Sequence, residues 1–278
     1  ADLQATVAEL HRANAGKDAF LAAVSHELRT PLTGILTMSE LLQTGLRGSL
    51  NPAQSQYVTT IHASGVRLLG TVNSILLYTN LMADTTPFGR EPCRLNEICT
   101  AATYAVRQKA EDKQQRITQL VSDINLLIIS DPQSIRQVIE ELLDNAIKFT
   151  PSGGSIALTV TAEPTTGATT GATPGSTPRS MPVEVPGTRA PAGGLPAAAV
   201  RIVVADTGIG MNEEQLAALF HPFTQGDQTL ARRFDGLGLG LAYVHEVVAR
   251  LDGTVSVNAE PAQGSRFTVI LPSRPPTE

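Results

Sequence analysis

The sequence predicts an α+β protein, in which an N-terminal helical hairpin that forms a dimeric four-helix bundle precedes an α/β sandwich. Apolar residues recur at alternating spacings of three and four through the first 82 positions, which is typical of a bundle seam. Beyond a Pro- and Gly-bearing linker at Ala83–Pro92, short apolar strands interleave with helices without a regular βαβ repeat. A length of 278 residues, 42% of them hydrophobic, suits two folded domains.

Composition excludes several classes of protein. The net charge of −5 gives no electrostatic reason to expect nucleic acid or an anionic membrane as a partner. No apolar stretch approaches the roughly 18–20 residues of a membrane span. Cys93 and Cys99 are too few for a disulfide framework, so we expect two buried or half-buried thiols. The chain begins at Ala1 without a signal peptide, and we expect a cytoplasmic fragment whose upstream sensor domain is missing.

The first predicted helix, 1–46, places one histidine on its outer face. If one row of apolar seam residues occupies heptad position a, His26 falls at position f, which is farthest from the seam. Glu27 then lies at position g, and Thr30 lies one helical turn after His26 on the same outer face. Polar seam residues near Gly16 are either a tolerated imperfection or a pliable joint to a sensor. Pro31 should bend the helix. The a positions are Leu21, Leu28, Ile35 and Leu42.

A loop over Thr44–Pro52 leads into a second predicted helix, Pro52–Met82. Its apolar stripe cannot be buried by a single hairpin, so we expect a homodimer. The stripe comprises Val58, Ile61, Val66, Leu69, Val72, Ile75 and Leu76.

The remaining elements follow from apolar periodicity and from capping signals. Helix Asp131–Thr150 has Asp131 or Ser130 as its N-cap and Pro132 in its first turn. The other predicted helices are Leu95–Gln114 and Ala242–Leu251, and the predicted strands are Ile117–Val121, Leu126–Ile129, Ile156–Ala162, Val200–Ala205, Val255–Val257 and Arg266–Leu271. The segment Glu163–Ala199 is rich in Pro, Thr, Gly and Ala, which predicts a disordered insertion at the surface.

Two glycine clusters indicate a nucleotide site. Asp206, Gly208 and Gly210 follow a strand, where glycines permit close approach and the carboxylate can accept from an amine such as adenine N6. Gly236, Gly238 and Gly240 open a helix, where backbone N–H groups suit an anion. Neither cluster is specific alone, because turns after strands often carry Asp and Gly.

The helix Ser134–Phe149 carries a third polar group of residues. Glu141, Asn145 and Lys148 are spaced to share one helix face, and such a face suits Mg²⁺ and phosphate. Without the other motifs, the polar residues on this helix are better explained as an ordinary face exposed to solvent.

Together these motifs resemble those of two-component sensor histidine kinases. Phe20-x-x-x-Val-Ser-His-Glu-Leu-Arg-Thr-Pro-Leu32 resembles the H-box, and Glu141-Leu-Leu-Asp-Asn-Ala-Ile-Lys148 the N-box. The G1, F and G2 boxes follow in family order at Asp206–Gly210, Phe220–Phe223 and Gly236–Leu241. The resemblance implies a signalling helix (1–18), a HisKA dimerisation and phosphotransfer domain (19–84) and a Bergerat-type HATPase domain (92–274).

The resemblance also implies the chemistry: ATP-dependent phosphorylation of His26, with transfer to an aspartate of a response regulator receiver domain. His26, Glu27, Thr30 and Glu141 are the implied catalytic residues, and Asn145 with Glu141 would bind Mg²⁺. ATP would bind under a lid at about Met211–Asp235. The implied nucleotide-binding residues are Asn145, Lys148, Asp206, Gly208, Gly210, Phe220, Arg232, Arg233, Gly236, Gly238, Gly240 and Leu241.

Three positions depart from the family pattern. Glu141 stands where many histidine kinases have an asparagine, and in gyrase-type relatives a glutamate four before the Asn activates water. It is therefore a base here or a helper in Mg²⁺ binding. Leu237 replaces a frequent Thr or Ser, and Asp235 a frequent glycine. Leu237 and Asp235 keep one alternative open, a non-catalytic dimeric nucleotide-binding module. The position of Thr30, one turn from His26, keeps open a second, a phosphatase-dominant member.

Overall fold

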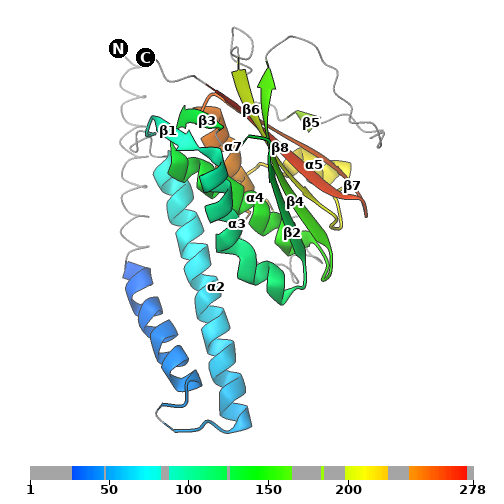
Figure 1. Ribbon diagram of the computed structural model, residues 1–278. Coiled ribbons are helices and arrows are strands. Elements are labelled where there is room, and N and C mark those ends of the chain that lie inside the picture. Colours follow the sequence, from blue (N-terminus) through cyan, green and yellow to red (C-terminus); the bar gives the residue numbers. More distant parts are fainter. Residues whose placement is uncertain are drawn as a thin grey trace, which may run out of the picture. The chain divides into compact units, whose positions relative to one another are not determined.

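The computed structural model divides the chain into a helical unit, up to Pro87, and an α/β unit that contains nearly all of the rest (Figure 1). The structure describes residues 27–46, 48–82, 88–123, 126–164, 183–184, 198–224 and 238–273. No helix in these ranges is long and apolar enough to cross a membrane.

The helical unit is a hairpin of a helix at 27–43 and α2 (Pro52–Met82), whose bounds are those predicted. The turn between them uses Gly45 and Gly48 at φ of 70° and 120°, which side chains rarely adopt. Asn51 begins α2 with a capping box: its side chain accepts from Gln54 N at 2.8 Å, and Gln54 Oε1 accepts from Asn51 N at 3.0 Å. The first helix continues through Pro31.

Four buried residues of α2 recur every seven positions and therefore lie on one face of the helix: Val58, Gly65, Val72 and Thr79. A Cβ at Gly65 would lie only 2.8 Å from Leu36 Cδ2, so glycine lets the two helices approach closely.

Polar side chains also join the two helices. Buried Ser39 donates to Leu36 O at 2.8 Å and lies 3.0 Å from His62 Nδ1 on α2. Arg29, within the H-box, donates to Asn73 Oδ1 at 2.8 Å. Sequence periodicity gave no sign of these pairs, because each joins positions 23 to 44 residues apart.

The predicted seam of the first helix stays exposed in the single chain. Leu28, Ile35 and Met38 are 47%, 49% and 61% exposed, whereas Leu32 is 5% exposed. An apolar groove that includes Ile35, Met38 and Ile61 runs along the hairpin. The hairpin therefore leaves a continuous apolar surface uncovered.

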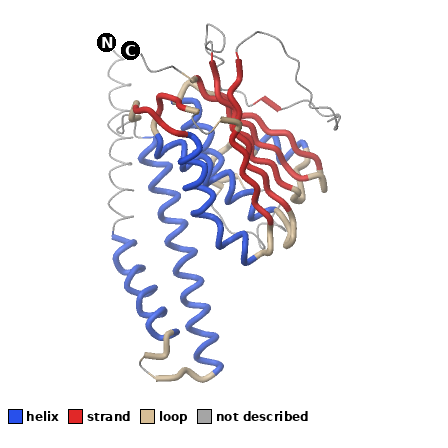
Figure 2. Tube along the Cα trace, in the orientation of Figure 1, coloured by secondary structure: helices blue, strands red, loops and turns tan. Residues whose placement is uncertain are grey.

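The α/β unit is built on a six-stranded sheet in the order β2-β4-β6-β8-β7-β5 (Figure 2). Among the described strands of this sheet, β2 and β4 pair in parallel, and the other pairs are antiparallel. A separate antiparallel pair joins β1 (Glu91–Arg94) to β3 (Leu127–Ser130). The strands of the large sheet are β2 (Arg116–Val121), β4 (Ser155–Pro164), β5 (Val183–Glu184), β6 (Ala198–Asp206), β7 (Thr254–Glu260) and β8 (Gly264–Pro272).

Helices α3 (Leu95–Asp112), α4 (Pro132–Phe149) and α7 (Gly240–Arg250) lie against one face of this sheet (Figure 2). Alternate residues of β4 and the apolar stripe of α4 make the core between them, because β4 has a period of two and α4 a period near four. The residues at the centre of this core are at most 1% exposed: Ile139, Leu142, Leu143, Ile156, Leu158 and Val160.

Three elements were not predicted. Strand β1 lies at the end of the predicted linker Ala83–Pro92, and helix α5 (Glu213–Ala218) lies inside the predicted lid. The insertion predicted to be disordered contributes β5, which pairs with β7 through Val183 and Val257. The insertion therefore supplies an edge strand as well as a connection.

Candidate functional site

Helix α4 is anchored at its start by Asp131. The side chain of Asp131 accepts from Ser134 N at 2.8 Å, which satisfies an N–H of the first turn, and Pro132 follows the cap. Its second carboxylate oxygen accepts from Gly89 N at 2.9 Å. One residue thus fixes both the helix and the chain segment that enters this unit.

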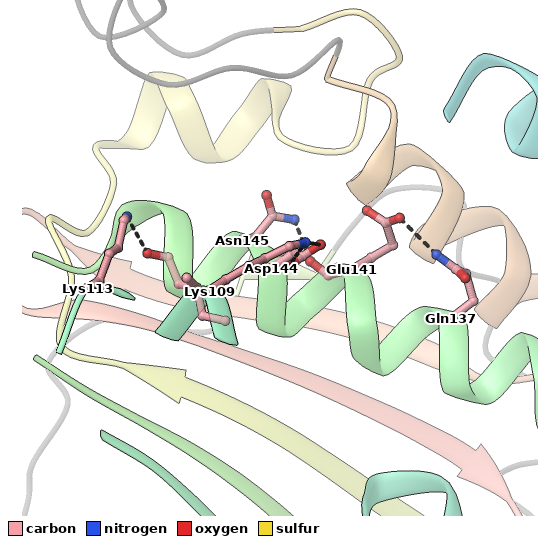
Figure 3. Close-up of polar contacts among 7 residues, drawn as sticks. Lys109, Lys113, Gln137, Glu141, Asp144 and Asn145 are labelled. Atoms are coloured by element: carbon pink, nitrogen blue, oxygen red, sulfur yellow. Dashed lines mark hydrogen bonds and ion pairs between the residues drawn. The ribbon is translucent and has the colours of Figure 1, made fainter. Parts of the chain in front are cut away.

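Asn145 is oriented by its own helix (Figure 3). Its Nδ2 donates to Glu141 O at 2.9 Å. Because a carbonyl oxygen only accepts hydrogen bonds, the nitrogen must face the backbone, and the amide oxygen points away from it. An amide oxygen so directed is a ligand of the kind that Mg²⁺ takes.

The Glu141 carboxylate is half-buried between α4 and the start of α7. Gln137 Nε2 donates to its Oε1 at 3.1 Å (Figure 3). The other oxygen faces Gly240, where a Cβ would collide with it and would lie 4.0 Å from Asn145 Nδ2. Gly240 therefore allows the first turn of α7 to approach the two predicted metal ligands.

Burial is the main cause that raises the pKa of Glu141; the hydrogen bond from Gln137 and the charge of Lys109 oppose it. Asp144, on the same helix, is held by Lys109 Nζ at 2.8 Å to both oxygens (Figure 3). That ion pair is exposed and joins α3 to α4, so Asp144 serves the packing of helices.

The C-terminal carbonyls of α4 are capped by side chains from the segment that follows α3. Lys113 Nζ donates to Ile147 O at 2.7 Å, and Gln115 Nε2 donates to Thr150 O at 2.6 Å. These bonds satisfy acceptors that a helix end leaves open. Lys148, a predicted phosphate ligand, has its Nζ 5.1 Å from the centre of the Phe149 ring.

The Asp206 turn is bonded to the same end of α4. Gly208 N donates to Asp206 Oδ1 at 2.7 Å, and Ile209 N donates to Phe149 O at 3.3 Å. Desolvation is the main cause that raises the pKa of Asp206; bonds from Gly208 and Ser265 act in the opposite direction. A half-buried carboxyl held in this way can accept a hydrogen bond from an amine of a ligand.

Close backbone contacts, which the sequence did not reveal, explain why glycine occupies several positions in and near this turn. A Cβ at Gly210, where φ is 65°, would collide with Glu260 O, and one at Gly264 with Asp206 O. A Cβ at Gly208 would lie 2.7 Å from Phe149 O. Gly208 and Gly210 were expected to give a nucleotide room, but the protein's own backbone already requires glycine there.

Residues 219–224, which we call the F segment, follow α5. Asn212 caps α5 with a capping box to Gln215. Phe220 is 8% exposed and its ring lies 5.8 Å from that of His245 on α7, tilted by 46°. Phe223 is exposed and has φ of 62°, in the left-handed region.

The structure brings together the residues predicted on α4 and at the start of α7, and joins the Asp206 turn to the end of α4. Leu241 is half-buried in the first turn of α7, and Gly238 precedes that turn with φ of 69°. Glu27 and Thr30 are exposed on the first helix of the other unit. The predicted residues that lie outside the described ranges are His26, Arg232, Arg233 and Gly236.

Five residues of the α/β unit support the site and were missed: Lys113, Gln115, Gln137, Glu260 and Gly264. Gln137 precedes Glu141 by one turn, and that spacing was a usable signal. Among the described residues no three His, Cys, Asp or Glu side chains gather as a metal site. Protein ligands alone therefore do not form a closed metal cage in the described part of the chain.

Comparison with protein families gives two matches. Residues 130–275, about half of the chain, match the family "Histidine kinase-, DNA gyrase B-, and HSP90-like ATPase". Residues 16–84 match the "His Kinase A (phospho-acceptor) domain". The first match covers α4, the Asp206 turn and α7; the second covers the hairpin.

Two curated relatives are named as kinases. The chain is 33% identical over 267 residues to the circadian input-output histidine kinase CikA of Synechococcus elongatus, covering 94% of this chain and 31% of that protein. It is 34% identical over 257 residues to the autoinducer 2 sensor kinase/phosphatase LuxQ of Vibrio cholerae, covering 91% and 26%. The chain thus spans about a third or less of the length of these relatives.

Among solved structures, full-length ShkA in complex with AMPPNP superimposes with a TM-score of 0.67 at 29% identity, covering 94% of this chain and 47% of that one. The histidine kinase AdeS of Acinetobacter baumannii gives a TM-score of 0.52 at 19% identity, covering 90% and 98%. The second likeness concerns the fold alone.

Proposed function

This chain belongs to the sensor histidine kinase family, with a phospho-acceptor domain followed by the family's ATPase domain, and we propose that it is an ATP-dependent protein-histidine kinase core. In this proposal it phosphorylates His26 and passes the phosphoryl group to an aspartate of a response regulator. We propose domain limits of 19–84 for phosphotransfer and 92–274 for catalysis, after a signalling helix at 1–18.

The observation that carries the proposal is the meeting of three family motifs on helix α4. Asn145 and Glu141 lie under the first turn of α7 at Gly240, and the end of α4 holds the Asp206 turn. A nucleotide laid along α4 would thus meet an adenine acceptor at one end and phosphate donors at the other.

In the proposed complex, Asp206 accepts from the adenine amine, and Phe220 and Leu241 contribute apolar contact. The N–H groups of Gly236, Gly238 and Gly240 bind phosphate oxygens, as helix N-termini do. Lys148 together with Arg232 or Arg233 neutralises phosphate charge.

The residues present fit a magnesium ion. Asn145 offers an amide oxygen that faces away from its helix, and Glu141 offers a carboxylate beside it. Mg²⁺ binds protein through one or two such oxygens and completes its shell with phosphates and water, which agrees with the absence of a three-carboxylate group among the described residues. When bound, it neutralises charge on the β- and γ-phosphates.

The proposed phosphoryl transfer uses residues of the H-box. A neutral ring nitrogen of His26 attacks the γ-phosphorus; the N–P bond forms as the bond from phosphorus to the β–γ bridging oxygen breaks, and ADP leaves. Glu27, exposed on the same helix, orients the histidine and accepts its proton. Thr30, one turn on, is placed to act in removing phosphate from the regulator.

The proposed partners are a second copy of this chain, a receiver domain and an upstream sensor, and the proposed location is the cytoplasm. The exposed seam at Leu28 and Ile35 supports the dimer, because apolar surface of this extent is covered in a four-helix bundle.

Calorimetry of Mg-ATP binding tests the proposed site. Asn145→Ala and Asp206→Asn should each weaken affinity by about ten- to a hundredfold, because a hydrogen bond to a charged group is worth roughly 1.5–3 kcal/mol. Asp112→Asn is a matched control: Asp112 lies on the exposed end of α3, and Gln108, at 2.9 Å, is the donor that its side chain has among the described residues. Unchanged affinity in both site variants would place the nucleotide elsewhere.

A further inference from the structure

His245 has no role in the kinase chemistry, yet one of its ring nitrogens is in an unusual position. The residue lies in the middle of α7 and is half-buried. Its Nε2 is buried and has no hydrogen-bond partner among the residues that the structure describes. Buried polar atoms are nearly always paired, so an unpaired ring nitrogen calls for an explanation.

The ring of His245 packs against Phe220, with centroids 5.8 Å apart and planes tilted by 46°. Phe220 is the buried residue of the F segment, which otherwise exposes His221 and Phe223. Leu216, on α5, is the neighbouring buried anchor. His245 is thus one of the contacts that hold the F segment against the domain.

We propose that neutral His245 is a positioning residue that holds Phe220 and the F segment in place, and that its protonation releases this segment and weakens nucleotide binding. This inference rests on the proposed function, because it takes the F segment to be part of the nucleotide site.

The chemistry of imidazole gives the direction of the effect. In the neutral ring one nitrogen carries no proton, and Nε2 can be that nitrogen without needing an acceptor. In the charged ring both nitrogens are donors, and none of the described residues is a hydrogen-bond partner for a charged N–H at Nε2. The ring must then leave its site or admit water, and either change separates it from Phe220.

Charges around the ring favour the neutral form. Burial is the main cause that lowers the pKa of His245, and His221, in the F segment, acts in the same direction. Glu246, the next residue of α7, acts in the opposite direction. Helix α4 and strand β7 also pack against α7, and the charged groups that act on His245 are Glu246 and His221.

The sign follows by linkage. A histidine whose pKa is lower in the packed form than in the released form binds protons mainly when released. The packed form is therefore favoured above the ordinary histidine pKa of about 6.5 and is lost progressively below it. Nucleotide affinity should fall over the same pH range.

Calorimetry with AMPPNP and Mg²⁺ on the full chain tests this. His245→Phe keeps an aromatic ring against Phe220 but cannot be protonated, so it should bind like wild type at about pH 7.5. At about pH 5.5 the wild type should lose about five- to tenfold more affinity than His245→Phe. Because both proteins bind the same ligand at each pH, any effect of protonating AMPPNP itself is equal for the two and cancels in the comparison.

His62→Gln is the control, since His62 lies in the hairpin and should leave the pH dependence of binding unchanged. Equal pH dependence in wild type and His245→Phe would overturn the proposal. If neither protein binds AMPPNP at about pH 7.5, the proposed function fails instead.

An NMR titration of the histidine ring protons keeps the inference testable in every case, including a His245→Phe variant that fails to fold. In nucleotide-free wild type, the pKa of His245 should lie below about 6.5, and added AMPPNP should lower it further, because linkage is reciprocal. An ordinary pKa that does not respond to His221→Gln or to AMPPNP would overturn the proposal.

Discussion

The hairpin and the α/β unit use their apolar residues in different ways. In the α/β unit the faces of α4 and β4 close on each other, and residues such as Leu142 and Leu158 are fully buried. In the hairpin one set, Leu32 and Val72 among them, is buried within the chain, while Leu28 and Ile35 remain about half exposed. The described core of the α/β unit is therefore closed within one chain, whereas the hairpin leaves apolar side chains uncovered, which supports the proposed dimer.

The largest expected effect comes from breaking the closed unit at Gly210. Gly210→Ala would bring its methyl group into Glu260 O at a positive φ, and neither backbone segment can move without separating the Asp206 turn from β7 and β8. We expect a loss of about 4 kcal/mol or more in the free energy of unfolding. Chemical denaturation of the α/β transition measures it.

Gly153→Ala is the matched control. Gly153 also has a positive φ, of 81°, but nothing lies within 4 Å of its Cβ position. Gly153→Ala should lower the free energy of unfolding by only about 1–2 kcal/mol, which is the cost of placing alanine in the left-handed conformation. If the two variants are equally stable, the contact between Gly210 and Glu260 does not hold the turn.

Charged substitutions on the exposed seam test whether the hairpin forms a dimer. Leu28→Glu or Ile35→Glu should convert dimers to monomers or aggregates, because a carboxylate would enter an apolar interface. Thr33→Glu should be tolerated, since Thr33 is exposed away from the seam. Light scattering decides: a monomeric wild type, or a dimer that ignores both seam variants, contradicts the bundle.

Packing inside the hairpin gives a smaller effect. Gly65→Ala places a methyl group 2.8 Å from Leu36 Cδ2. The helices or the Leu36 side chain must then move apart from it, which should lower the free energy of unfolding by about 1–3 kcal/mol. Gly70→Ala, in open space on the same helix, should raise stability by about 0.5–1 kcal/mol. A stabilising Gly65→Ala would mean that the helices can separate freely.

The smallest effect is expected from deleting Gly167–Gly194, which removes β5. The pairing of Val183 with Val257 is short, and a short turn can close the connection between β4 and β6. Folding and autophosphorylation should be nearly unchanged, with a loss in melting temperature of at most a few degrees. A selective loss of activity would give the insertion a role that the fold does not indicate.

The sequence predicted long, periodic elements well and short ones poorly. Helix α2 has the predicted bounds, and α4 differs by one residue at each end, since capping signals and apolar periodicity are local. Strand β1 has a single buried residue, Cys93, and β5 has two residues in all, so neither carries a detectable pattern. Their pairing depends on distant strands.

The site shows the same limit. Motif order indicated Asn145, Asp206 and Gly240 as one site, but it could not show that Gly240 lies against Glu141. Nor could it show that Gly210 is required by Glu260, because these contacts join positions far apart in the chain. Local patterns predict which residue types matter, and tertiary contacts decide which atoms they meet.

The measurement that tests the central claim most directly is incubation of the full chain with γ-labelled ATP and Mg²⁺. Wild type should incorporate label that survives alkali and is lost in acid, as a phosphoramidate is. His26→Gln should abolish the label while calorimetry still detects nucleotide binding. Acid-stable label, or full labelling of His26→Gln, would contradict the assignment of this chain as a kinase that phosphorylates His26.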